Sequence, residues 1–207
     1  MYRIKEIFYS LQGEGFHTGR AAAFIRFSGC NLWSGNEEDR ETAQCNFCDT
    51  DFAGTDGDFG GVYEADRLVE TVLSICSTPE SPFIVCTGGE PLLQMDDQLI
   101  AVLHAKGCAV AVETNGTKPA IPGIDWITVS PKIGTALRQT SGNELKLVYP
   151  QDGLAPAQFE SCAFDHFFLQ PIDSPKRPDA LARCIEYCLL NPKWRLSMQL
   201  NKAAGIK

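Results

Sequence analysis

The sequence predicts an α/β fold, in the form of an abbreviated, open barrel (a partial TIM barrel) built on a parallel sheet. Short apolar strands alternate with connecting segments along most of the chain, and repeated strand-crossing-strand units place parallel strands side by side. Some connections carry the apolar stripe of a helix, whereas others, notably 116–123 and 131–140, contain too much Gly and Pro for full helices. We therefore expect a barrel that is trimmed and does not close.

The first two strands are expected close to the start of the chain. Tyr2 to Gln12 alternates in part between polar and apolar residues and ends at a glycine loop, Gly13-Glu14-Gly15. Ala21 to Phe27 is a buried strand interrupted by Arg26. A guanidinium in an apolar run must find an anion, since burying it alone is costly. A salt bridge to a core carboxylate and a contact with an anionic ligand would both satisfy Arg26.

The remaining elements follow in order. Ser34 to Gln44 is polar and long enough for about two short helical turns, Asp51 to Gly61 has the composition of a loop, and Glu64 to Cys76 carries a helical apolar stripe. Beyond these, we expect strands at 83–87, 110–113, 126–129, 144–149, 167–170 and 195–199, and helices at 97–105 and 178–190. Because parallel strands present ligands at their carboxyl ends, the site should lie along that edge.

Length and charge narrow the class of protein. A chain of 207 residues suits one domain, 1–207, with a sizeable core. A formal net charge of -8 argues against a surface that neutralises nucleic-acid phosphates, so a small-molecule partner is expected. The first residues lack the pattern of a targeting segment, and no apolar run approaches the length of a membrane span. We expect a cytoplasmic protein without a membrane partner.

Six of the nine cysteines are scattered among apolar neighbours, which suits core packing in a reducing compartment better than disulfides; they are Cys76, Cys86, Cys108, Cys162, Cys184 and Cys188. The other three, Cys30, Cys45 and Cys48, are separated by fourteen and then two residues. The tight Cys45-x-x-Cys48 pair favours metal binding over packing. Three protein ligands would leave a position open for chemistry on an iron-sulfur cluster, while a zinc module with a distant fourth ligand stays an alternative.

A second motif follows in FIVCTGGEP, from Phe83 to Pro91: an apolar strand that ends in Gly88, Gly89 and Glu90. Here bare backbone can approach a ligand, and Glu90 is placed to accept a hydrogen bond from an amine. Together with three cysteines that leave one position open, this motif resembles the radical S-adenosylmethionine enzymes. That superfamily usually has three residues between its first two cysteines, whereas 31–44 expands the gap here.

The expanded gap is similar to that of one branch of the 7-carboxy-7-deazaguanine synthases. The resemblance runs from end to end, through the blocks KEIFYSLQGEG, RFSGCNLW, CDTDF, CTGGEP, ETNG, SPK, NELK, QPID and WRLSMQ. It implies a radical S-adenosylmethionine carbon-nitrogen lyase that converts 6-carboxy-5,6,7,8-tetrahydropterin to 7-carboxy-7-deazaguanine with loss of ammonia, in the route to queuosine and related 7-deazapurines. It also implies a fold of the radical S-adenosylmethionine type, a homodimer, and an electron donor such as flavodoxin.

The resemblance assigns site residues to four groups. A [4Fe-4S] cluster would be ligated by Cys30, Cys45 and Cys48, and a magnesium ion by Thr50. S-adenosylmethionine would contact Phe47, Gly88, Gly89, Glu90, Glu113, Ser130, Pro131, Lys132, Gln170, Pro171, Ile172 and Asp173. Substrate would contact Leu11, Gln12, Gly13, Glu14, Arg26, Thr87 and Lys207. Each polar residue taken alone would more often be a cap or a turn, and their shared place at one sheet edge is what favours a site.

Two other functions would use the same motifs. A radical S-adenosylmethionine activase that makes a glycyl radical on a partner protein would have the shorter cysteine gap and an exposed platform for that partner. A zinc-binding module would not be an enzyme, and it would lack iron and sulfide after anaerobic reconstitution.

Overall fold

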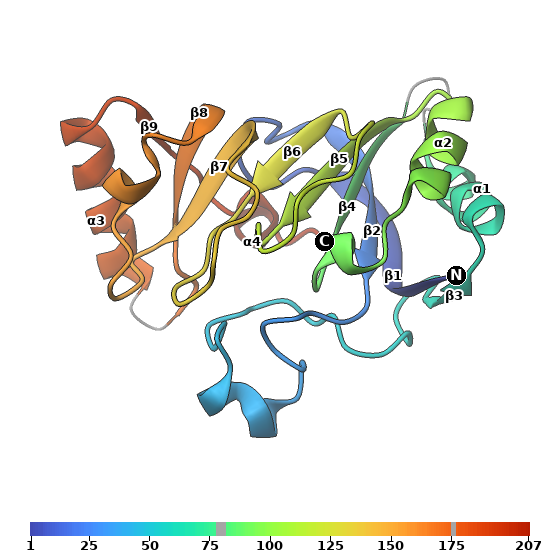
Figure 1. The fold of residues 1–207 in the computed structure, drawn as a ribbon, viewed down its shortest axis with the longest axis horizontal. Coiled ribbons are helices and arrows are strands. Elements are labelled where there is room, and N and C mark those ends of the chain that lie inside the picture. The colour runs from blue at the N-terminus through green and yellow to red at the C-terminus, as the bar shows by residue number, and fades with distance from the viewer. Residues whose placement is uncertain (78–81, 175–176) are drawn as a thin grey trace.

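One curved sheet organises the chain, as a computed structural model describes it for residues 1–77, 82–174 and 177–207 (Figure 1). Within these residues nine strands follow the order β3-β1-β2-β4-β5-β6-β7-β8-β9. Their bounds are β1 Tyr2–Leu11, β2 Ala21–Phe27, β3 Gly61–Tyr63, β4 Phe83–Gly88, β5 Ala109–Thr114, β6 Trp126–Val129, β7 Ser141–Tyr149, β8 Ala163–Pro171 and β9 Trp194–Leu196. β1 is antiparallel to β2 and β3, and every pairing from β2 to β9 is parallel. β3 and β9 end the sheet in this part of the chain, so the barrel is open.

Helices cover the outer face of the sheet near its two ends (Figure 1). α1 (Ala65–Ile75) and α2 (Asp97–Ala105) lie together over β1, β2 and β5, while α3 (Arg177–Leu190) packs on β8 and β9. A short α4 (Leu200–Ala204) follows the last strand. The described residues also form three 3-10 helices, η1 Glu37–Thr42, η2 Pro91–Leu93 and η3 Pro156–Phe159. No helix in the described ranges is long and apolar enough to cross a membrane.

The two-residue period of the strands separates an apolar outer face from a more polar inner face. On β7, Leu145 and Leu147 belong to the outer core under α3, whereas Glu144 and Lys146 alternate with them and are also buried. Inside the barrel, a small apolar cluster contains Ala22, Phe24, Phe83, Val85 and Ala111, which lie before the strand ends. The polar residues Arg26, Thr87 and Glu113 come next along the same strands, each two residues beyond an apolar one.

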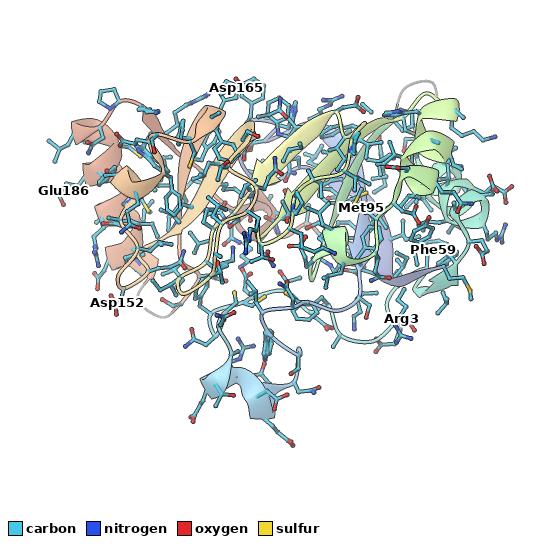
Figure 2. The ribbon with its side chains drawn as sticks, in the orientation of Figure 1. Arg3, Phe59, Met95, Asp152, Asp165 and Glu186 are labelled. Carbon is cyan, nitrogen blue, oxygen red and sulfur yellow. The ribbon has the colours of Figure 1, made fainter. Side chains whose placement is uncertain are left out.

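The direction of the strands fixes which edge carries the site. In Figure 2 Asp152, which follows β7, lies at the lower edge, and Asp165, near the start of β8, lies at the upper edge. The carboxyl ends of the parallel strands therefore point down in this view. The segment that contains η1 projects from the same edge (Figure 1).

The predicted elements agree with the structure except in a few places. The segment predicted as a loop over 51–61 differs from the structure only at Gly61, which begins β3 and pairs with β1. The last strand, predicted over 195–199, already ends at Leu196, and α4 begins at Leu200. The nine cysteines are free. Of the six expected in the core, Cys86, Cys108 and Cys184 are buried, while Cys76, Cys162 and Cys188 are partly exposed.

Candidate active site

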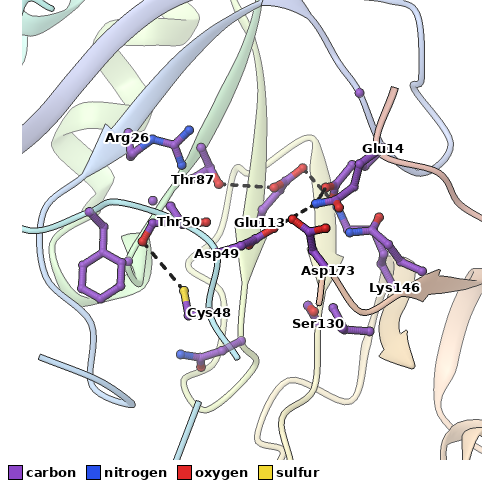
Figure 3. A pocket seen from close by; sticks show the side chains of 18 of the residues that line it. Glu14, Arg26, Cys48, Asp49, Thr50, Thr87, Glu113, Ser130, Lys146 and Asp173 are labelled. Carbon is purple, nitrogen blue, oxygen red and sulfur yellow. Dashed lines mark hydrogen bonds and ion pairs between the residues drawn. The ribbon is translucent and has the colours of Figure 1, made fainter. Parts of the chain in front are cut away.

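A cavity of about 360 Å³ lies at the carboxyl ends of the parallel strands (Figure 3). Its size falls within the range of small-molecule sites. It brings together most of the residues that the sequence assigned to a site: Leu11, Gln12, Gly13, Glu14, Arg26, Cys30, Cys45, Phe47, Cys48, Thr50, Thr87, Gly88, Gly89, Glu113, Ser130, Lys132, Gln170, Pro171, Ile172, Asp173 and Lys207. Glu90 and Pro131 do not line it.

The three candidate cluster cysteines share one wall of the cavity, although they come from distant positions. Cys30 follows β2, whereas Cys45 and Cys48 follow the projecting η1 segment. The Cys45 thiol hydrogen-bonds to the Cys48 sulfur, which lowers the pKa of Cys48 and raises that of Cys45. Burial raises the pKa of Cys30, and the charges of the three sulfurs influence one another.

No three His, Cys, Asp or Glu residues of the described ranges are arranged to hold a single metal ion. A zinc ion would require sulfurs that converge at about 2.3 Å from one point. An iron-sulfur cluster is a larger body whose iron atoms each take one thiolate, so its ligands lie farther apart. The three thiols around one cavity could supply one thiolate to each of three irons of such a cluster.

One arginine, Arg40, connects the projecting segment to the backbone around Cys48. The Arg40 guanidinium donates hydrogen bonds of 2.9 Å to the carbonyl oxygens of Asn46 and Cys48, and it lies 4.1 Å from the centre of the Trp33 ring. Gln44 donates a hydrogen bond of 3.1 Å to the Gly134 carbonyl oxygen in the segment after β6. The insertion thus connects the segment that carries Cys45 and Cys48 to other parts of the chain.

The glycine pair brings bare backbone close to the cysteine segment rather than only to a ligand. A Cβ atom on Gly89 would lie 1.9 Å from the Gly29 carbonyl oxygen, and one on Gly88, whose φ is +119°, would lie 2.4 Å from that of Phe27. The Glu90 amide also donates a hydrogen bond of 2.9 Å to Gly29. The end of β4 therefore holds the chain that leads to Cys30, and a side chain at either glycine would displace it.

Glu90 differs from its predicted arrangement, because its side chain is fully buried and its oxygens contact the chain itself. They accept hydrogen bonds from the Leu92 amide at 3.1 Å, the Thr114 hydroxyl at 2.8 Å and the Asn115 amide at 2.8 Å. The Asn115 side chain in turn donates to that of Asn31 at 3.0 Å. The carboxylate thus supports the residue next to Cys30 from behind the cavity wall.

Polar side chains meet where the loop after β1 faces β5. Gln12 donates a hydrogen bond of 3.0 Å to one oxygen of Glu113, and Thr87 donates one of 3.2 Å to the other. Although burial would raise it, the pKa of Glu113 is held below its ordinary value by Lys146, Gln12 and Thr87. Glu14 accepts a hydrogen bond from Lys146 at 2.5 Å (Figure 3). These residues form a fixed set of acceptors and donors inside the barrel.

Arg26 has found its anion within the chain. Its Nε atom donates to Glu6 at 2.9 Å, and both side chains are about one-fifth exposed at the cavity. The Lys207 ammonium lies 3.1 Å from the second Glu6 oxygen and 2.6 Å from Asp58. The contact with Glu6 uses the Nε atom of Arg26 and not its two terminal nitrogens. A guanidinium can donate a planar pair of hydrogen bonds to a carboxylate.

The opposite wall comes from β6, β8 and α4. Lys132 donates to the Ser130 hydroxyl at 2.6 Å, and its pKa is lowered by burial. Lys202 on α4 forms ion pairs with Asp49 and with Asp173, which joins the cysteine segment to the QPID block. The last helix therefore lines the cavity and connects two segments that are remote from it in the sequence.

Several contributors were not among the predicted site residues. Asp49, Asn115, Lys146, Gln199, Asn201 and Lys202 also line the cavity. Asn115 and Lys146 lie inside the blocks ETNG and NELK. These two motifs therefore marked both positions, but no role at the site was assigned to either residue. Nothing near Lys202 in the sequence indicated that a short terminal helix reaches Asp49, because that contact depends on the tertiary fold.

Comparisons with known proteins connect this site to one family. No protein-family model matches the chain. The chain is 55% identical over 208 residues to the 7-carboxy-7-deazaguanine synthase of Bradyrhizobium diazoefficiens, covering all of this chain and 99% of that protein. It is 54% identical to the synthase of Nitratidesulfovibrio vulgaris, covering 99% of each. The crystal structure of QueE from Escherichia coli superposes with a TM-score of 0.70 at 29% identity, covering 96% of this chain and 94% of that one.

These matches span essentially the whole length of both partners in each pair, so they include every motif around the cavity. The structural match also identifies the open parallel barrel as the partial barrel of radical S-adenosylmethionine enzymes. The chain therefore belongs to the 7-carboxy-7-deazaguanine synthase family, whose members are radical S-adenosylmethionine carbon-nitrogen lyases.

Proposed function

We propose that this cavity binds a [4Fe-4S] cluster on Cys30, Cys45 and Cys48 and S-adenosylmethionine beside it, and that it converts 6-carboxy-5,6,7,8-tetrahydropterin to 7-carboxy-7-deazaguanine. The observation that carries the proposal is the meeting of three thiols with the polar ends of the parallel strands in one cavity. Family membership supports the cluster and the cofactor. When bound, they would supply a 5'-deoxyadenosyl radical that takes a hydrogen from substrate C6 and later returns it.

The chain's own residues would bind and orient the two molecules. Ser130, Lys132 and the segment 170–173 form the wall proposed for S-adenosylmethionine, with Phe47 near the adenine. Glu113 would accept hydrogen bonds from the ribose hydroxyls, and the backbone of Gly88 and Gly89 would lie beside the methionine group. Glu90 and Pro131 do not line the cavity, so we propose that they act indirectly, through Asn115 and through the cavity wall.

Substrate would lie on the side of the cavity formed by β1, β2 and the end of α4. Arg26 would pair with the substrate carboxylate through its terminal nitrogens, while Leu11, Gln12, Gly13, Glu14, Thr87 and Lys207 would surround the pterin. Thr50, next to Cys48, would hold a magnesium ion whose remaining positions are filled by water and substrate oxygens. Burial of this space would protect a radical from solvent.

We further propose that the chain works as one domain, as a homodimer, and that a reduced flavodoxin supplies the electron. The single continuous sheet supports the first point. Analytical ultracentrifugation of the purified chain tests the homodimer, and reduction assays with purified flavodoxin test the electron donor.

The direct test is product formation. The chain is reconstituted with iron and sulfide without oxygen, then incubated with carboxytetrahydropterin, S-adenosylmethionine, magnesium and a reductant. The expected product is the carboxylated deazaguanine, identified by mass spectrometry. Reconstituted protein that contains a full cluster and cleaves S-adenosylmethionine but leaves the pterin intact would refute the proposed substrate.

A further inference from the structure

Lys146 on β7 is a buried cation that has no part in the roles given above. Its ammonium lies 2.5 Å from an oxygen of Glu14 and 3.5 Å from one of Glu113, and its side chain is only 5% exposed. Glu14 belongs to the loop after β1, and Glu113 lies near the end of β5, so one ammonium joins two elements that are distant in the sequence (Figure 3).

Other charges around Lys146 make the surroundings strongly acidic. Glu144 lies two residues earlier on the same strand face and accepts a hydrogen bond of 2.9 Å from the Phe16 amide. Burial raises the pKa of Glu144. Lys132 is a second buried cation whose charge reaches Lys146, but its ammonium donates to Ser130 rather than to these carboxylates. The carboxylates of Glu14, Glu113 and Glu144 thus all lie near the Lys146 ammonium.

The charge on Lys146 favours the ionised form of Glu113, which can only accept hydrogen bonds. Burial alone favours the neutral form of a carboxyl group, and a neutral carboxyl presents a donor where a ribose hydroxyl or a pterin N–H also needs to donate. The pKa of Lys146 is raised by Glu113, Glu14 and Glu144 in spite of its burial, so its ammonium stays charged.

We propose that Lys146 is a positioning residue whose buried ammonium joins the carboxylates of Glu14 and Glu113, so that substrate binding and S-adenosylmethionine binding favour each other. The inference rests on the proposed function, since it uses Glu14 on the substrate side and Glu113 on the cofactor side. Each ligand would fix one of two carboxylates that already share one ammonium.

The test is anaerobic calorimetry of both ligands on reconstituted enzyme between pH 6 and 8.5. In the wild type, affinity should change little over this range, and bound substrate should tighten S-adenosylmethionine. In Lys146→Met, both ligands should bind at least about tenfold more weakly, because a buried charged hydrogen-bond partner is lost. The loss should be larger at pH 6 than at 8.5, because Glu113 loses the cation that most strongly holds its pKa below the ordinary value, so it is protonated more readily at low pH.

Controls separate charge from packing. Lys146→Arg keeps the charge and should retain the flat pH profile and the mutual tightening. Lys106→Met removes an exposed lysine at the end of α2 and should bind both ligands as the wild type does. Should Lys146→Met fail to fold in a thermal unfolding scan, Lys146→Gln, whose amide still donates hydrogen bonds, answers the same question.

Two outcomes would overturn the inference: wild-type affinities in the Lys146→Met chain, or an equal loss at every pH that Lys146→Arg does not restore. A failure of the proposed site roles looks different. In that case Glu14→Gln and Glu113→Gln would leave the affinity for substrate and for S-adenosylmethionine unchanged, whatever Lys146 does.

Discussion

Replacing Glu90 by glutamine should destabilise the fold before it affects ligand binding directly. The wild-type carboxylate is fully buried and accepts three hydrogen bonds, from Leu92, Thr114 and Asn115. A glutamine can keep the two bonds made to one oxygen, but its NH₂ group then faces the Asn115 N–H as donor against donor. Losing a charge-assisted bond and leaving a buried donor unpaired costs about 2–4 kcal/mol.

For a chain of this length, that loss corresponds to a melting temperature lower by roughly 5–15 °C. The assay is thermal unfolding of the chain without cluster or cofactor, with Glu186→Gln, an exposed position on α3, as the control (Figure 2). Iron content after reconstitution should also fall, because Asn115 supports Asn31 beside Cys30. An unchanged melting temperature together with weaker S-adenosylmethionine binding would refute this reasoning and restore a direct contact between Glu90 and the cofactor.

Three further outcomes are expected. Alanine at Cys30, Cys45 or Cys48 should leave a folded chain that retains no stable cluster, and iron and sulfide analysis after anaerobic reconstitution would contradict this if the wild-type content of about four irons persisted. Thr50→Ala should keep the cluster and S-adenosylmethionine but lose the magnesium stimulation of turnover, and a magnesium titration with an unchanged response would reduce Thr50 to a turn residue. Burial would raise the pKa of Asp49, but Lys202 and Gln199 hold it below its ordinary value, so stability should fall as the pH drops below about 4. Urea unfolding at pH 3 and 6 should show a smaller difference for Asp49→Asn, and an equal difference would exclude that contribution.

Elements of the fold could be predicted from the sequence wherever the spacing of apolar residues along one helix or strand shows which of its faces is buried. The strand Ala21–Phe27 and the helix Asp97–Ala105 have the bounds that their residues predict, because their apolar spacing depends only on the element itself. β3 could not be predicted in this way. Its three residues gain strand geometry by pairing with β1, and a glycine-rich segment carries no period that announces such a partner.

The candidate site likewise has features that local motifs predict and features that depend on tertiary contacts. Most residues chosen by motif line the cavity, because the carboxyl ends of parallel strands gather at one edge whatever the sequence between them. Whether a residue contacts a ligand or supports another residue depends on where its oxygens find donors. Glu90 was expected to face the cofactor, and only the positions of Leu92, Thr114 and Asn115 reveal that its carboxylate accepts three hydrogen bonds from the chain itself.

The residues at the two ends of the chain differ in their contacts, because Lys207 lines the cavity and Met1 does not. Ser10 donates a hydrogen bond of 2.7 Å to the carbonyl oxygen of Lys207, and the Leu200 amide donates one of 2.9 Å to Gly13. Met1, by contrast, is 81% exposed. An affinity tag appended after Lys207 would start at the cavity rim and compete with these contacts, whereas one placed before Met1 would extend into solvent.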